Sequence, residues 1–165
     1  MLERLSRGLD RVNRLCAGFS MLAMLAACVI LTSSVVTRYF FKLPTDWQDE
    51  ASVFLLVGAI FLSGAYVQAR RGHIGIGVLT GLLSPRWERA RLRLCDFLSL
   101  LFCSFFAWKS WTLWLEAVTE GQTTDSTWAP PLWIPYCLMA TGMTLLALQL
   151  ALQTAGAGAP EGARE

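Results

Sequence analysis

Charged residues leave four long gaps along the chain, and these gaps are the strongest pattern in the sequence. The gaps are residues 15–37, 51–69, 97–115 (interrupted only by Lys109) and 126–160. A membrane-spanning helix needs about 20 mostly apolar residues, and an open sheet cannot satisfy its backbone hydrogen bonds in lipid. We therefore predict an all-α membrane protein whose four spanning helices lie at about residues 15–37, 51–69, 95–115 and 133–153.

The first gap allows a second interpretation. An arginine-containing arm precedes it, and Leu25-Ala26-Ala27-Cys28 is similar to a lipoprotein cleavage box. However, the apolar run continues for nine residues beyond Cys28, and the arm also contains Glu3 and Asp10. Both features favour a spanning helix over a cleaved signal.

The basic residues gather in two of the five segments outside the spans. The N-terminal arm holds four arginines and the loop between the second and third spans holds six, whereas the other two loops are acidic. Because Lys and Arg mark the cytoplasmic side, we predict that both termini and the middle loop are cytoplasmic. The net charge of +2 then divides into +5 inside and −3 outside.

The composition excludes several classes of protein. Hydrophobic residues make up 55% of the 165 residues and charged residues 16%, against about 25% charged in soluble domains. This excludes a disordered chain, a collagen-like chain and a nucleic-acid binder, so we expect no nucleic-acid partner. The length also excludes a transporter with two repeated halves. The seven tryptophans fit a protein that meets the lipid–water interface.

Two parts of the chain outside the spans have a distinct pattern. Residues 74–94 are apolar but too short to span, and Ser84-Pro85 matches an N-cap followed by a proline in the first helical turn. We interpret them as an interfacial amphipathic segment. Its basic and aromatic side chains would bind anionic lipids or brace a partner: Arg86, Trp87, Arg89 and Arg93. The tail, residues 154–165, is predicted to be disordered.

The start of the second span and the helix surfaces carry local signals. Thr45 and Gln48 match a capping box, and Asp49 and Glu50 follow in the first turn, where the helix dipole favours acids. Small residues recur four apart, a spacing that lets membrane helices approach closely. These pairs are Ala23/Ala27, Ala59/Ser63 and Ala65/Ala69.

Trp108, Trp111 and Trp114 recur every three residues and form a stripe along one side of a helix. The stripe is either a structural surface, which would be an interfacial belt or a packing surface, or a box that binds a cofactor or substrate.

No group of residues matches a known catalytic or cofactor site. His73 is the single histidine, the five cysteines contain no Cys-x-x-Cys, and there is no phosphate-binding glycine loop. We therefore expect no catalytic residue, no metal and no cofactor. Lys109 is the one charge deep within a span, whereas Asp96 stands at the inner end of the same helix. Lys109 lies about four residues beyond the middle of that segment and would snorkel, pair with a partner's acid or line an ion path.

Several motifs together resemble one protein family. These motifs are Arg38-Tyr39-Phe40-Phe41, Trp47-Gln48-Asp49-Glu50, the segment 64–74, and the segments 121–126 and 131–136. Their order is similar to that in the small membrane (DctQ-type) subunit of tripartite ATP-independent periplasmic (TRAP) transporters.

The resemblance implies a non-catalytic scaffold in the bacterial inner membrane. Its partners would be a large membrane subunit, which takes up an organic anion with sodium, and a periplasmic substrate-binding protein. Candidate partner-interface residues are Arg38, Trp47, Glu50, Arg70, His73, Lys109 and Trp133. Two alternatives remain open: an anchor or assembly subunit of another complex, and a small transporter acting alone as an oligomer.

Overall fold

The computed structural model describes residues 2–70 and 85–154, and its regular structure is helical. Four α-helices account for most of these residues: α1 (Leu2–Val36), α2 (Asp46–Ala69), α3 (Pro85–Glu120) and α4 (Trp133–Thr154). A short π-helix, η1 (Thr37–Phe41), continues α1. All four α-helices contain a stretch long and apolar enough to cross a membrane, which confirms the predicted all-α class with four helices of membrane-spanning length.

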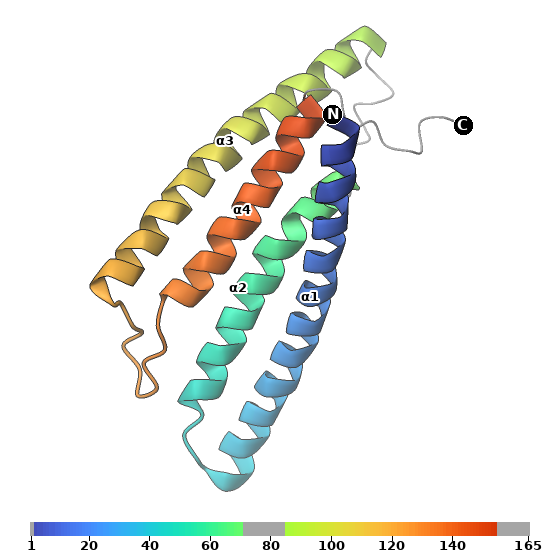
Figure 1. Ribbon diagram of the computed structural model, residues 1–165. Helices are drawn as coiled ribbons and strands as arrows, with labels where there is room; N and C mark the ends of the chain where they lie inside the picture. The colour runs from blue at the N-terminus through green and yellow to red at the C-terminus, as the bar shows by residue number, and fades with distance from the viewer. Residues whose placement is uncertain (1, 71–84, 155–165) are drawn as a thin grey trace.

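The four helices stand side by side in one layer and do not close into a bundle. The order across the layer is α1, α2, α4, α3, so that α2 and α4 lie in the middle and α1 and α3 form the edges (Figure 1). Helices α2 and α4 run in the same direction, and each edge helix runs antiparallel to the helix on which it packs. A single layer leaves two broad faces, and large apolar side chains are exposed along α1 and α3, among them Leu15, Leu22, Phe102 and Trp108.

Small residues form the contacts between the helices of the layer. Ala23, Ala27, Ala59 and Ala65 are buried, as expected for positions where helices approach closely. The tightest crossing joins α2 and α4 at Gly142, where an added Cβ would lie 2.4 Å from the backbone oxygen of Phe61. A glycine is required here because the two backbones leave no room for a side chain.

Polar side chains join three helices at the end of the layer where α1 begins. Asn13 of α1 donates a hydrogen bond to Gln149 of α4 at 3.1 Å. Gln68 of α2 donates to the side chain of Gln153 at 2.8 Å, and Gln153 donates back to the backbone oxygen of Gln68 at 3.0 Å. We call this set the amide cluster. It fixes the register of α1 and α2 against α4, because shifting either helix would break a bond between partly buried groups.

The opposite end of the layer carries the two shorter connections, and we call it the loop end. Residues 121–132 fold back on themselves through hydrogen bonds from Thr124 to Pro130 at 3.1 Å and from Leu132 to Gln122 at 3.0 Å. Gly121 opens this loop with a φ of 63°, a left-handed conformation that glycine adopts without strain.

Three helices extend beyond the spans predicted from the charge pattern. Helix α1 begins at Leu2, α2 begins at Asp46, and α3 begins at Pro85. The boundary expected near residue 94 is absent, because residues 85–94 are the first turns of α3 and continue into the span. A charged residue marks the end of the segment that lies in lipid, but the helix continues through it, and this explains why the helices are longer than the predicted spans. The first half of the predicted interfacial segment and the tail from residue 155 lie outside the described residues.

Candidate functional site

The loop end begins with an irregular end to the first helix. After Val36 the backbone widens into the π-turn η1, which stops at Lys42 in a left-handed conformation with φ 53°. Three aromatic side chains of η1 project from this end: Tyr39, Phe40 and Phe41 are 78%, 72% and 69% exposed. The widened turn also carries Arg38, whose side chain reaches back across the start of α2. π-turns inside helices frequently occur at functional sites.

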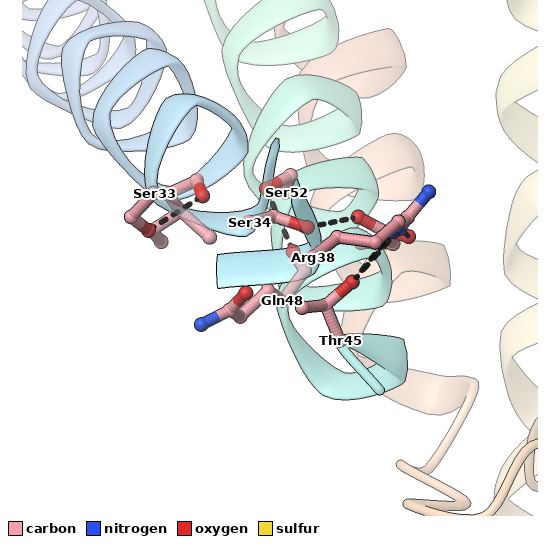
Figure 2. Close-up of polar contacts among 8 residues, drawn as sticks. Ser33, Ser34, Arg38, Thr45, Gln48 and Ser52 are labelled. Atoms are coloured by element: carbon pink, nitrogen blue, oxygen red, sulfur yellow. Dashed lines mark hydrogen bonds and ion pairs between the residues drawn. The ribbon is translucent and has the colours of Figure 1, made fainter. Parts of the chain in front are cut away.

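Four side chains from these elements form one polar cluster, which we call the Arg38 cluster. Arg38 donates to the hydroxyl of Thr45 from Nε at 3.2 Å and from Nη2 at 2.8 Å, and Nη2 also lies 2.6 Å from a carboxylate oxygen of Asp49. Ser34 donates to the other oxygen of Asp49 at 2.9 Å. Figure 2 shows Arg38 reaching from the end of the first helix toward Thr45, with Ser34 beside it.

The members of the Arg38 cluster differ in their exposure to solvent. Ser34 and Thr45 are 1% and 3% exposed, whereas the side chains of Arg38 and Asp49 are 62% and 47% exposed. Ion pairs this accessible to solvent contribute about 0–1 kcal/mol. The arrangement therefore positions α1 against α2 through several bonds and leaves one side of the guanidinium accessible to a partner.

The capping box predicted at the start of α2 does not form. Thr45 does occupy the N-cap position, but its side chain makes no cap hydrogen bond, because the hydroxyl accepts from Arg38 instead. The backbone oxygen of Thr45 accepts from Gln48 and Asp49 at 3.1 and 3.2 Å. The side-chain oxygen of Gln48 is buried and has no partner among the described residues.

The 121–132 loop is held against the start of α2 by two contacts. Thr127 donates to the carboxylate of Asp46 at 2.9 Å. The rings of Trp47 and Trp128 meet edge to face, with centroids 6.5 Å apart. Trp47 is a predicted interface residue, and it remains 51% exposed while holding this loop. The loop end is thus a continuous surface built from α2 and the loop before α4.

The next two predicted residues lie close to this surface. Glu50 is partly buried, and its Oε2 is covered but has no hydrogen-bond partner among the described residues. Trp133 is the first residue of α4 and is 44% exposed. Trp133 is available to a partner, and the structure brings neither residue into the Arg38 cluster.

The tryptophan stripe on α3 divides between two surroundings. Trp111 faces α4 and donates to the hydroxyl of Thr144 at 3.0 Å, and its ring meets that of Trp114 edge to face at 5.3 Å. Trp108 is 61% exposed. Because Thr144 is near the middle of α4, Trp111 contributes to packing inside the layer. This agrees with the packing-surface interpretation of the stripe.

Lys109 lies apart from the other predicted residues. It is exposed on α3, and its ammonium lies 5.2 Å from the centroid of the Trp108 ring. The part of the chain that the structure describes offers it no ion pair with a carboxylate. Arg70, at the other end of the layer, follows the last residue of α2 and lies over the ring of Tyr66 at 5.4 Å.

The remaining predicted residues have no described side chain. His73 lies outside the described residues. The backbone places four candidates on the first turns of α3, and nothing is assigned to their side chains: Arg86, Trp87, Arg89 and Arg93. Within residues 2–70 and 85–154, no three side chains of His, Cys, Asp or Glu gather as they would around a metal ion.

Sequence reasoning missed the partners that complete these groups. Ser34 was one of several hydroxyls in an apolar run, and Asp49 was explained by the helix dipole alone. The amide cluster was also missed, although four amide residues at the same end of their helices were a usable signal: Asn13, Gln68, Gln149 and Gln153. Amides in a membrane helix are costly unless they bond to another helix.

Comparison with known proteins gives one match to this arrangement. The family model described as "Tripartite ATP-independent periplasmic transporters, DctQ component" matches residues 27–157, which include η1, the Arg38 cluster and three of the four α-helices in full. A comparison with curated proteins found no match.

Proposed function

Because the chain belongs to the DctQ family of tripartite ATP-independent periplasmic transporters, we propose that it is the non-catalytic scaffold subunit of such a transporter. In this proposal it braces the large membrane subunit, which takes up an organic anion such as a C4-dicarboxylate together with sodium. A periplasmic binding protein delivers the anion, and the subunit lies in the bacterial inner membrane with both termini cytoplasmic. Membership of the family and the four apolar helices support a multi-pass membrane component of a transporter.

The single-layer arrangement of the helices is the observation that carries the scaffold role. A closed bundle would turn its apolar side chains inward and present one convex surface to lipid. The row α1, α2, α4, α3 instead presents two broad faces, so one face can pack on a partner while the other meets lipid (Figure 1). A frame extended by such a layer resists tilting when the transport domain of the large subunit slides within it.

The polar contacts of the chain support the same role. The Arg38 cluster ties α1 to α2, and the amide cluster ties α1 and α2 to α4. Both sets make the layer rigid, which a brace requires. The loop end, with Trp47, Glu50 and Trp133 at or near its surface, is the side that would face the periplasm and meet the binding protein.

Reconstitution tests the proposal directly. Liposomes that contain this chain alone should accumulate no organic anion under a sodium gradient, even with the binding protein present. Liposomes with the large subunit and this chain should accumulate the anion when the binding protein is added. Uptake by the chain alone, or equal uptake by the large subunit without it, would refute the scaffold role.

A further inference from the structure

Lys109 is a charge well inside a membrane-spanning helix. The span predicted in α3, residues 95–115, has its midpoint at residue 105, so Lys109 is four residues beyond it. Four residues correspond to about 6 Å of helix, and half of the hydrocarbon core is about 15 Å. The α-carbon of Lys109 therefore lies about 9 Å from the nearer edge of the hydrocarbon.

The lysine side chain cannot cover this distance. An extended lysine reaches about 6 Å from its α-carbon, roughly two thirds of what is needed. Its direction adds to the shortfall, because side chains on a helix tilt toward the helix N-terminus. On α3 that is the direction of Pro85, away from the nearer edge at the loop end (Figure 1). Snorkelling to the headgroups is thus the less favourable arrangement.

The surface within one turn of Lys109 is mainly apolar, and the nearest acid on the same side of α3 is Glu116, two turns farther toward the loop end. At 100° per residue, Phe102, Phe105 and Leu113 lie within about 40° of Lys109 on the helix. They are 64%, 55% and 41% exposed. Trp108 supplies a ring face 5.2 Å from the ammonium, a cation–π contact that stabilises the charge but does not neutralise it. The charge sits on α3, an edge helix that packs on α4 alone among the described helices.

We propose that Lys109 forms an ion pair with an Asp or Glu in a membrane helix of the large subunit. Charged groups inside a membrane occur almost only where they pair, and a carboxylate is the group that complements an ammonium. A second copy of this chain has no acid within residues 15–37, 51–69, 97–115 and 133–153, and its acids Asp96 and Glu116 stand at the two ends of the third span, so an acid deep in a helix of the large subunit fits the position of Lys109 better. The inference rests on the proposed scaffold function, and it selects the Lys109 side of α3 as a contact surface.

Co-purification of the two membrane subunits tests this pair. We would express the full chain with the large subunit, extract the complex in a mild detergent, and compare the wild type with Lys109→Met and Lys109→Arg. Lys42→Met is the matched control, because Lys42 is an exposed lysine beyond the end of the span. We expect at least a tenfold loss of recovered large subunit for Lys109→Met, and near wild-type recovery for Lys109→Arg and Lys42→Met.

The outcomes separate the possible partners of the lysine. Equal recovery for Lys109→Met and the wild type would overturn the ion pair. It would leave lipid phosphate as the partner of Lys109, because detergent removes most lipid and the loss of a lipid contact would not change the recovery of the large subunit. If the wild-type chain recovers no large subunit, the scaffold function itself fails and the ion pair fails with it.

A charge exchange covers the case in which Lys109→Met is poorly inserted. Lys109→Asp would be combined, one at a time, with Lys in place of each intramembrane acid of the large subunit. Restoration of complex and uptake by one of these pairs, at least tenfold above Lys109→Asp alone, would identify the partner. Failure of every pair to restore association would overturn the proposal.

Discussion

The crossing of α2 and α4 at Gly142 gives a sharp test of how closely the layer is packed. A Cβ at Gly142 would lie 2.4 Å from the oxygen, 2.5 Å from the carbonyl carbon and 2.9 Å from the Cβ of Phe61. Two of these atoms belong to the backbone and cannot rotate away. Gly142→Ala must therefore push the two helices apart by about 1 Å, which is the shortfall from an ordinary contact.

The expected cost follows from the kind of contact that is lost. Overpacking by one carbon typically destabilises a protein by about 1–3 kcal/mol. Separating α2 from α4 also strains the bonds between Gln68 and Gln153, which join the same two helices. We expect Gly142→Ala to lower the free energy of unfolding by about 2 kcal/mol, which is roughly a thirtyfold change in the equilibrium constant.

Two other glycines provide matched controls on the facing helix. A Cβ at Gly64 would meet only Leu146, at 3.9 Å, which is an ordinary contact. A Cβ at Gly58 would lie 3.0 Å from the flexible end of Leu138. We expect Gly64→Ala to be neutral or stabilising, since alanine favours helix over glycine, and Gly58→Ala to fall between the two.

Unfolding in mixed detergent micelles measures this series. Circular dichroism against the mole fraction of a denaturing detergent would give a midpoint for each variant. The midpoints should rank Gly64→Ala, Gly58→Ala and Gly142→Ala from most to least stable. If Gly142→Ala unfolds at the same midpoint as Gly64→Ala, the two backbones do not meet as closely as the structure places them.

Three further experiments test the polar contacts of the layer. Arg38→Met should destabilise the chain by about 1 kcal/mol, because Thr45 and a carboxylate each lose a charged donor, and Lys42→Met should change the same unfolding midpoint by less than half as much. Gln153→Leu should lower the free energy of unfolding by about 1–2 kcal/mol, because it breaks both bonds between Gln68 and Gln153. A shift of the unfolding midpoint no larger than that of Lys42→Met would show that the amide cluster does not hold the register. A double-mutant cycle of Trp111→Phe and Thr144→Val should give a coupling energy of about 0.6 kcal/mol, whereas simple additivity would contradict the bond between the two side chains.

The number of helices and their approximate place could be predicted because the membrane makes one demand on every span. About 20 apolar residues are needed whatever the neighbours are, so gaps between charges locate the spans. Their ends were less predictable. The arginines at residues 4, 7, 11 and 14 end the apolar run, but they lie on α1 itself, because a helix satisfies its backbone equally well in lipid and in water.

The candidate site shows the same division. Arg38, Trp47 and Glu50 could be selected because they are charged or aromatic residues at a span boundary and stand in motifs that resemble the family. The residues that complete the Arg38 cluster could not be selected, since Ser34 and Asp49 are fifteen residues apart and meet only after α1 and α2 pack together. The sequence also suggested that Thr45 caps α2, yet a charged donor from the neighbouring helix took its hydroxyl.

Local composition by itself determined that this chain is an all-α membrane protein with four apolar helices and little ionisable chemistry. These properties depend on the transfer of each segment from water to lipid, which is set by the residues of that segment alone. Only the tertiary structure decided that the helices form an open row in the order α1, α2, α4, α3. In lipid no hydrophobic force selects one neighbour over another, so that order depends on close contacts between small residues and on a few interhelical hydrogen bonds.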